Sequence, residues 1–270
     1  QGFYTKNELQ LHIDRRKTRK DPRTFQVNTN IVDRPYQLEA IQRVAEHFVT
    51  DNPQGSMVGK ARKSLLVMAT GTGKTRVSAA IVDMLTKSNW VKRVLFLADR
   101  NALVTQAKNA FGKHLPNISS IDLTKEKEDS STRLVFSTYP SIMNKIDGVR
   151  RQDVRFYGVG HFDLIIIDEA HRSVYQKYKA IFDYFDCLLI GLTATPKKDI
   201  DHNTYTLFEI EDDNPTAAYE LDEAVREGHL VPPKGVSVPV KFQREGIKYN
   251  ELSPKEKQEY EEKFGDPTAG

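Results

Sequence analysis

The chain has 270 residues, enough for one large domain or two small ones, and 39% of them are hydrophobic, which allows a substantial core. Its net charge of +3 is too small and too dispersed to predict a nucleic-acid ligand by itself. A single cysteine, Cys187, excludes an internal disulfide framework, and no apolar run approaches membrane-spanning length. The N-terminus lacks the layout of a signal peptide, so we expect a cytoplasmic protein. Because the chain begins at Gln1 without an initiator Met, we also expect a piece of a longer protein.

Residues 1–30 are polar and carry the densest basic cluster of the chain, Arg15 to Lys20, with Arg23 nearby. Two interpretations stay open for this cluster: a solvated linker, which we favour, or a contact with a phosphate backbone. From Pro35 the pattern changes, because apolar residues recur at helical spacing and predict an amphipathic helix over 36–50. The Asp-Asn-Pro-Gln-Gly segment that follows predicts the end of this helix.

The most informative segment is Met-Ala-Thr-Gly-Thr-Gly-Lys-Thr at 68–75, which directly follows an apolar run. A strand, a glycine-rich loop and a helix that begins with Lys-Thr form the arrangement that holds a nucleoside triphosphate. The glycines let backbone N–H groups approach the phosphates, and the helix N-terminus favours negative charge. We expect Lys74 to reach the β- and γ-phosphates and the Thr75 hydroxyl to bind Mg²⁺. Met68 departs from the strict pattern, which has a glycine at that position.

Short apolar runs alternate with helical patterns through the middle of the chain. The predicted strands are 64–68, 93–98, 133–137, 163–167 and 187–191, and the predicted helices lie near 74–87, 101–111, 140–146 and 175–184. This alternation predicts an α/β fold with a mostly parallel sheet and helices on both faces. Ligands of such sheets bind at the carboxyl ends of the strands, where the glycine loop and Asp168-Glu169 both fall. We therefore expect these segments to form a single site.

Asp168 and Glu169 follow the apolar run Leu-Ile-Ile-Ile at 164–167. We expect Asp168 to hold Mg²⁺ opposite Thr75, and Glu169 to orient and deprotonate the attacking water. The alternative, two solvent-facing acids in a turn, is disfavoured by the strand before them and the loop upstream. The pair therefore predicts hydrolysis of the γ-phosphate.

Two weaker signals lie elsewhere. Thr193-Ala194-Thr195 follows the last predicted strand, and its hydroxyls either hydrogen-bond the acid pair or simply cap a turn. Gln37 could read a base edge with two hydrogen bonds, although most glutamines lie on surfaces.

After Pro196 the alternation stops. Residues 197–270 contain an acidic run, a predicted helix near 217–227, a β-like run at 236–242 and a predicted helix near 253–264. We therefore divide the chain into an N-terminal linker, 1–30, an ATP-binding domain, 31–196, and an α+β connector, 197–270.

Four motifs together resemble the first RecA-like domain of a superfamily 2 helicase or translocase of the DEAH-box type. They are Arg34-Pro35-Tyr36-Gln37, Ala69 to Thr75, Asp168-Glu169-Ala170-His171 and Thr193-Ala194-Thr195-Pro196. In that family the first glycine of the loop is commonly absent. The resemblance implies a P-loop NTPase that binds ATP and Mg²⁺, with Lys74, Asp168 and Glu169 as its catalytic residues. It further implies that Arg34 and Gln37 read adenine, that Thr70, Gly71, Thr72, Gly73, Lys74 and Thr75 hold phosphates, and that His171, Thr193 and Thr195 couple nucleotide state to nucleic-acid grip.

A narrower resemblance concerns restriction-enzyme motors. Residues 96–107, 137–139 and 168–173 look like their DNA-contacting and acid motifs, and 219–233 and 246–249 are similar to the segment after the first motor domain of the R subunit of type I restriction enzymes. This resemblance implies double-stranded DNA and the methylation and specificity subunits as partners. It makes Arg100, Asn101, Thr138 and Tyr139 candidates for grasping DNA phosphates, which predicts sequence-independent, salt-sensitive binding. For Arg100 a plain surface charge or a salt bridge remains an equal alternative.

The resemblance also implies a second RecA-like domain whose arginine finger accelerates hydrolysis roughly a thousandfold or more. No Gln-Arg-Gly-Arg signature of that domain occurs in the 270 residues, so we expect this chain to bind ATP·Mg²⁺ but to hydrolyse it weakly. The alternatives are another superfamily 2 DNA or RNA helicase, or a nucleotide-dependent binding module. Glu169 separates these classes, because a pure switch needs no acid to activate water. The adjacent acid pair disfavours a small-molecule kinase.

Overall fold

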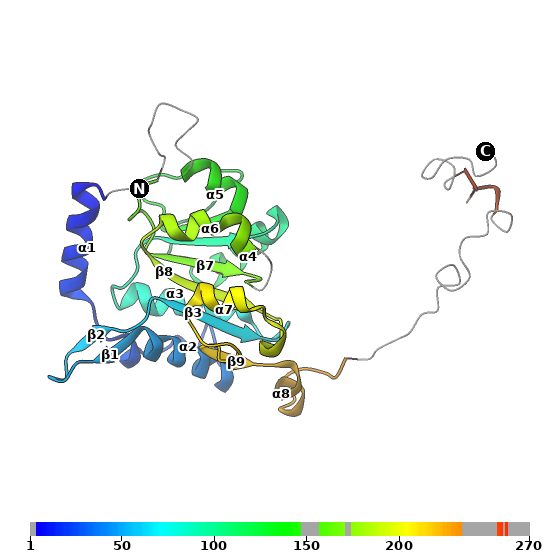
Figure 1. Ribbon diagram of the computed structural model, residues 1–270, viewed down its shortest axis with the longest axis horizontal. Coiled ribbons are helices and arrows are strands. Elements are labelled where there is room, and N and C mark those ends of the chain that lie inside the picture. The colour runs from blue at the N-terminus through cyan, green and yellow to red at the C-terminus, as the bar shows by residue number, and fades with distance from the viewer. Residues whose placement is uncertain (1–3, 147–156, 171–173, 234–252, 256, 259–270) are drawn as a thin grey trace. The chain divides into compact units, whose positions relative to one another are not determined.

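The structure is a computed structural model that describes residues 4–146, 157–170, 174–233, 253–255 and 257–258. Residue contacts divide the chain into two units, Gln1–Leu230 and Val231–Gly270. The first unit holds the sheet and its helices (Figure 1). In the second, residues 254–255 and 257–258 are helical, in agreement with the helix predicted near 253–264, while the β-like run at 236–242 lies outside the described residues.

A parallel sheet with the strand order β5-β6-β4-β7-β8-β3-β9 forms the centre of the first unit. The strands are β3 Lys63–Met68, β4 Val94–Ala98, β5 Ser120–Asp122, β6 Leu134–Thr138, β7 Leu164–Asp168, β8 Leu188–Thr193 and β9 Ala217–Tyr219. The central strands are buried on both faces, which explains why they read as continuous apolar runs rather than as alternating patterns. The α/β fold and the five predicted strands are confirmed, and the strand ends agree within two residues.

Helices cover both faces of the sheet (Figure 1), and the sheet separates two apolar cores, each packed between one face and its helices. On one face lie α2 Pro35–Phe48, α3 Lys74–Lys87 and α4 Asn101–His114, and on the other lie α5 Tyr139–Ile146, α6 Val174–Tyr184 and α7 His202–Phe208. Successive strand residues alternate between the two cores, as Leu65 and Leu66 do. None of the described helices combines the length and the apolar character that crossing a membrane requires.

Four short strands differ from the sequence predictions. The helix predicted near 217–227 is wrong at its start, because Ala217–Tyr219 forms β9 and pairs with β3, and only then does α8 Leu221–Arg226 follow. The break after α2 forms an antiparallel hairpin of β1 Val49–Asp51 and β2 Met57–Gly59. These strands and β5 have three residues each, too few to carry a periodic pattern, so pairing with a neighbouring strand decides their conformation.

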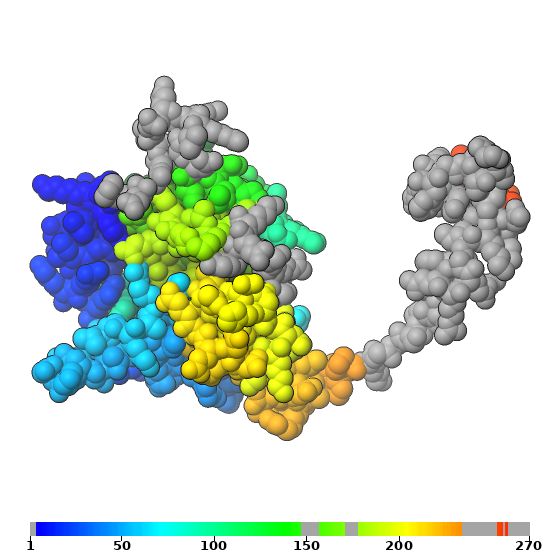
Figure 2. Space-filling view, in the orientation of Figure 1, coloured from blue at the N-terminus to red at the C-terminus, as the bar shows by residue number. Residues whose placement is uncertain are grey.

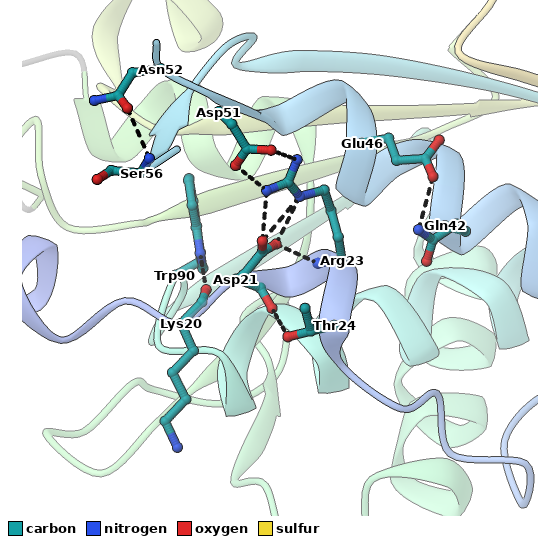
Figure 3. A network of polar contacts seen from close by, with 10 residues as sticks. All are labelled: Lys20, Asp21, Arg23, Thr24, Gln42, Glu46, Asp51, Asn52, Ser56 and Trp90. Carbon is teal, nitrogen blue, oxygen red and sulfur yellow. Dashed lines mark hydrogen bonds and ion pairs between the residues drawn. The ribbon is translucent and has the colours of Figure 1, made fainter. Parts of the chain in front are cut away.

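The N-terminal stretch is helical and attached to the sheet unit, whereas the sequence favoured a solvated linker. It contains α1 Lys6–Thr18 and the short η1 Pro22–Thr24. A capping box starts α1, because the Thr5 side chain accepts from the Glu8 N–H while the Glu8 carboxylate accepts from the Thr5 N–H. The Trp90 indole donates to the Lys20 carbonyl (2.9 Å), and Arg23 lies between the carboxylates of Asp21 and Asp51 (Figure 3).

Candidate functional site

The loop between β3 and α3 has the backbone geometry of a phosphate cradle. Gly71 and Gly73 adopt left-handed conformations, with φ of +88° and +91°, which glycine adopts without steric cost. Thr72 is buried between them, and its hydroxyl donates to the Ala69 carbonyl at 2.6 Å, which fixes the turn. The first helical residue of α3 is Lys74, so the backbone N–H groups that open this helix border the loop.

Lys74 and the two acids converge at one edge of the sheet. Strand β8 lies between β3, which leads into the loop, and β7, which ends at Asp168, and all three run parallel. The partly buried Lys74 ammonium donates to the Met68 carbonyl at 3.2 Å. Burial lowers the pKa of Lys74, while the negative charges of Glu169 and Asp168 act to raise it. The structure therefore brings Lys74, Asp168 and Glu169 together at one edge of the sheet.

The acid pair has strained geometry and unfavourable electrostatics. Glu169 has a φ of +55°, a conformation that non-glycine residues adopt at a free-energy cost and that occurs often at functional sites. Its N–H donates to Asp168 Oδ1 at 3.1 Å, and the next N–H, from Ala170, donates to the Leu192 carbonyl of β8. Burial raises the pKa of Asp168, and the adjacent Glu169 carboxylate raises it further, while Lys74 opposes both.

These groups fit a triphosphate with Mg²⁺. Burial and the neighbouring Glu169 carboxylate both raise the pKa of Asp168, so a cation beside it would relieve the repulsion between the two acids. Thr75 lies one residue after Lys74 and supplies a hydroxyl oxygen, the kind of hard ligand that Mg²⁺ prefers. Thr70 and Gly71 are exposed, so the outer side of the loop is open to a ligand.

Gln37 contacts the loop from α2. Its side-chain N–H donates to the Thr72 carbonyl at 2.9 Å, and the same carbonyl accepts from the Tyr36 hydroxyl. The Gln37 Oε1 atom is buried without a hydrogen-bond partner among the described residues. One amide hydrogen of Gln37 is used by Thr72, so the predicted pair of hydrogen bonds to a base would use Oε1 and the second amide hydrogen, and it stays a prediction. Arg34 donates to the Tyr36 hydroxyl at 3.1 Å and so lies at the same corner.

Comparison with known proteins places this geometry in a family. The model of a family described as "Type III restriction enzyme, res subunit" matches residues 30–198. The chain belongs to this family. It is 35% identical over 223 residues to the EcoAI endonuclease subunit of a type I restriction enzyme of Escherichia coli, and 31% identical over 224 residues to the EcoKI endonuclease subunit of Escherichia coli strain K12. These matches cover 79% and 73% of this chain but only 25% and 17% of those relatives.

A solved structure agrees with this placement. A fragment of a protein described as an HsdR subunit of a type I restriction enzyme from Vibrio vulnificus YJ016 superposes with a TM-score of 0.52 and 29% identity, over 84% of this chain and 38% of that one. The resemblance to a superfamily 2 motor domain of an R subunit, predicted from the motifs, is therefore confirmed, as is the RecA-like α/β fold.

Of the three residues predicted to couple nucleotide state to nucleic-acid binding, the structure describes Thr193 and Thr195. Thr193 is buried at the end of β8, beside Val67 of β3, and its Oγ1 accepts from the Thr195 N–H at 3.1 Å. That bond is the turn-capping alternative, and a coupling role for the two threonines stays a prediction. His171 lies outside the described residues.

The four DNA candidates separate into exposed and buried pairs. Arg100 and Asn101 are exposed where α4 begins, and Arg100 has a distant ion pair with Asp99 at 3.8 Å. Thr138 and Tyr139 are buried, and the Tyr139 ring stacks on Tyr178. The prediction that the Tyr139 side chain grasps a phosphate therefore does not fit the structure. Burial raises the pKa of Tyr139, and the negative charge of Asp168 raises it further, so this tyrosine lies near Asp168.

Sequence reasoning missed a group of residues that approach the loop from beyond residue 196. Tyr219 of β9 stacks on Tyr36 with ring centroids 3.8 Å apart and an interplanar angle of 6°, and the Tyr219 carbonyl accepts from the Ala69 N–H. Both tyrosines line a pocket of about 220 Å³ that also includes Met68. The only sequence signal was the likeness of 219–233 to restriction-enzyme motors, which gave no contact.

Proposed function

We propose that this chain is the ATP-hydrolysing motor domain of a DNA translocase, from the R subunit of a type I restriction enzyme. The observation that carries the proposal is the position of Lys74 within the electrostatic influence of both Asp168 and Glu169 at one sheet edge. A lysine at a glycine-rich loop opposite paired acids is the arrangement that phosphoryl-transfer NTPases use. The names of the relatives support the restriction-enzyme context, although the matched region is a small part of each.

Each residue has a role that its local structure permits. The N–H groups of the loop and of the first turn of α3 would hold phosphate oxygens, and the Lys74 ammonium would exchange the Met68 carbonyl for a phosphate. Thr75 and Asp168 would hold Mg²⁺, which neutralises phosphate charge when it is bound. The Glu169 carboxylate would accept a proton from the attacking water. Gln37 Oε1 would accept a hydrogen bond from the adenine amino group.

Duplex DNA is the proposed track of the motor. Arg100 and Asn101 are the exposed candidates for its phosphates, so binding should be independent of sequence and should weaken as salt rises. Recognition of a target sequence and methylation would belong to other subunits. Because the 270 residues lack the arginine signature of a second motor domain, we expect ATP binding with weak hydrolysis.

Glu169→Gln tests the proposal most directly. We expect this variant to bind ATP·Mg²⁺ within about threefold of the parent chain, because the substitution leaves the phosphate contacts intact, while residual hydrolysis falls by roughly a hundredfold. Calorimetric titration with a non-hydrolysable ATP analogue and a phosphate-release assay measure the two quantities. Glu211→Gln, at an exposed acid, is the matched control and should change neither.

Two further arms of the assay define the substrate and the failure of the proposal. Stimulation of phosphate release by duplex DNA but not by RNA would support the DNA motor over an RNA helicase. A Glu169→Gln chain that loses ATP affinity while it retains hydrolysis would refute the assigned role. Turnover by the parent chain alone at the rate of a complete motor would refute the expected weak hydrolysis.

A further inference from the structure

A second concave site lies at the opposite edge of the sheet. A pocket of about 520 Å³ opens between α1 and the segments that lead into β3, β7 and β8. The strand arrows point away from α1 in Figure 1, so this edge holds the amino ends of the strands and the Lys74 loop holds the carboxyl ends. Strands of five or six residues separate the two edges by roughly 17–20 Å. The pocket is therefore separate from the ATP site.

The basic cluster noted in the sequence lines part of this pocket. The cationic side chains of the lining are Arg16, Arg19, Lys60 and Arg62, His12 also lines it, and the acidic side chains are Asp163 and Asp186. Figure 2 shows α1, in dark blue, along the flank of the unit that also carries the light-blue hairpin region, so segments far apart in the sequence meet on one surface.

Both acids of the lining are already satisfied. Asp163 forms an ion pair with Arg15 and also accepts from the backbone N–H groups of Lys92 and Arg93, at 2.8 and 2.9 Å. Asp186 forms an ion pair with Arg62 and accepts from the Tyr4 hydroxyl. Each carboxylate therefore already has a partner, although the charge of Asp163 also acts on Arg19.

Arg16, Arg19 and Lys60 have no ion pair within the part of the chain that the structure describes. Arg19 is the most informative of them, because its guanidinium stacks over the Trp90 ring at 4.3 Å and its Nε–H is buried without an acceptor among those residues. Burial lowers the pKa of Arg19, and the like charges of Arg16 and Arg15 lower it further, while the charge of Asp163 opposes them in part. A buried donor surrounded by like charges is destabilising until an anion binds beside it.

We propose that this pocket binds a phosphate group through Arg16, Arg19 and Lys60. The planar guanidinium fork matches the oxygens of a phosphate, and three cations without an ion pair around one cavity can share the several oxygens of one phosphate group. The phosphate could belong to a nucleic-acid backbone or to a free nucleotide, and the experiment separates these sources. The proposal does not depend on the proposed function, because the two sites share no residue.

Trp90 makes the test specific, because it is the single tryptophan of the chain and it lines this pocket. Tryptophan emission of the full chain would be followed while adenosine monophosphate, a short DNA duplex or a glutamate oligopeptide is added. We expect a saturable change with the phosphate compounds and none with the peptide. The phosphate compound that saturates at the lower concentration identifies the source. An equal response to the peptide would overturn the assignment to phosphate.

Matched variants separate this site from general electrostatic attraction. Arg19→Gln and Lys60→Gln should each raise the half-saturating concentration roughly tenfold, because each removes a charge-assisted hydrogen bond to the phosphate. Lys60 is exposed, so its variant guards against the loss of folding that Arg19→Gln could bring. Lys17→Gln removes the same charge from α1 outside the pocket and should stay within twofold. Lys74→Ala should leave the emission change unaltered, since it acts only on the ATP loop.

The opposing outcomes are equally definite. The absence of any saturable change would overturn the proposal, and so would a loss in Lys17→Gln equal to that in Lys60→Gln. If the emission change vanished in Lys74→Ala, the signal would come from the nucleotide loop. Failure of the proposed function would appear instead as absent ATP binding with an intact Trp90 response.

Discussion

Strand β7 has an aspartate at each end, and the two residues are in opposite situations. Asp163, just before the strand, is buried with an arginine partner and two backbone N–H donors, each of which stabilises its charge. Asp168, the last residue of the strand, adjoins a second carboxylate and a lysine that is bonded to a carbonyl, and its pKa is raised. An aspartate therefore stabilises the fold at the start of β7, whereas the charged form of an aspartate is disfavoured at its end.

This contrast shows which end of the sheet is built for a ligand. Groups that serve the fold find their partners within the chain, whereas groups that await a ligand keep charges unbalanced and backbone strained. The carboxyl edge shows both features: the pKa of Asp168 is raised, and Glu169 has a positive φ. At the amino edge Asp163 has its full set of partners, whereas the buried Nε–H of Arg19 has no acceptor among the described residues. For this reason we assign a separate ligand to the amino edge.

The largest expected effect is on Asp163. Asp163→Ala leaves the Arg15 guanidinium and two N–H groups without their acceptor, and we expect the free energy of unfolding to fall by about 3–5 kcal/mol. Urea denaturation followed by circular dichroism measures this change. Asp14→Ala, at an exposed acid of α1, is the control and should stay within about 0.5 kcal/mol. A small effect at Asp163 would mean that this ion pair is not part of the stable fold, and the contrast along β7 would fail.

The sequence predicted the carboxyl edge far better than the amino edge. Lys74, Asp168 and Glu169 lie in contiguous motifs next to long apolar strands, so local pattern alone places them together. Arg19, Trp90 and Lys60 come from three separate segments with no shared motif, and only the docking of α1 brings them to one pocket. Tyr219 escaped prediction for the same reason, because a three-residue edge strand is specified by its partner and not by its own composition.

The second test compares two glycines. Gly73 has a φ of +91°, and a Cβ there would lie 2.6 Å from Gln37 Nε2, so Gly73→Ala should lower the free energy of unfolding by about 1–3 kcal/mol. Gly112 lies within α4 with nothing within 4 Å of an added Cβ, so Gly112→Ala should raise it by about 0.5–1 kcal/mol. Thermal unfolding of both variants gives opposite signs if the loop has the described conformation. A neutral or stabilising Gly73→Ala would show that the loop is not held in this left-handed turn.

The smallest expected change in the free energy of unfolding is that of Asp168→Asn. It tests the contrast between Asp163 and Asp168 most directly. Because the pKa of Asp168 is raised in the folded state, its ionisation destabilises the fold, and this cost is absent below the ordinary carboxyl pKa and complete above the folded one. Asp168→Asn should therefore stabilise the nucleotide-free chain near neutral pH, on the order of 0.5–2 kcal/mol, while it weakens ATP·Mg²⁺ binding. The gain should shrink as the pH falls through the range in which Asp168 takes up its proton. Asp199→Asn, at an exposed acid, should show no such dependence in calorimetric melts between pH 4 and 8. A variant that loses stability at neutral pH would mean that Asp168, like Asp163, is a structural residue.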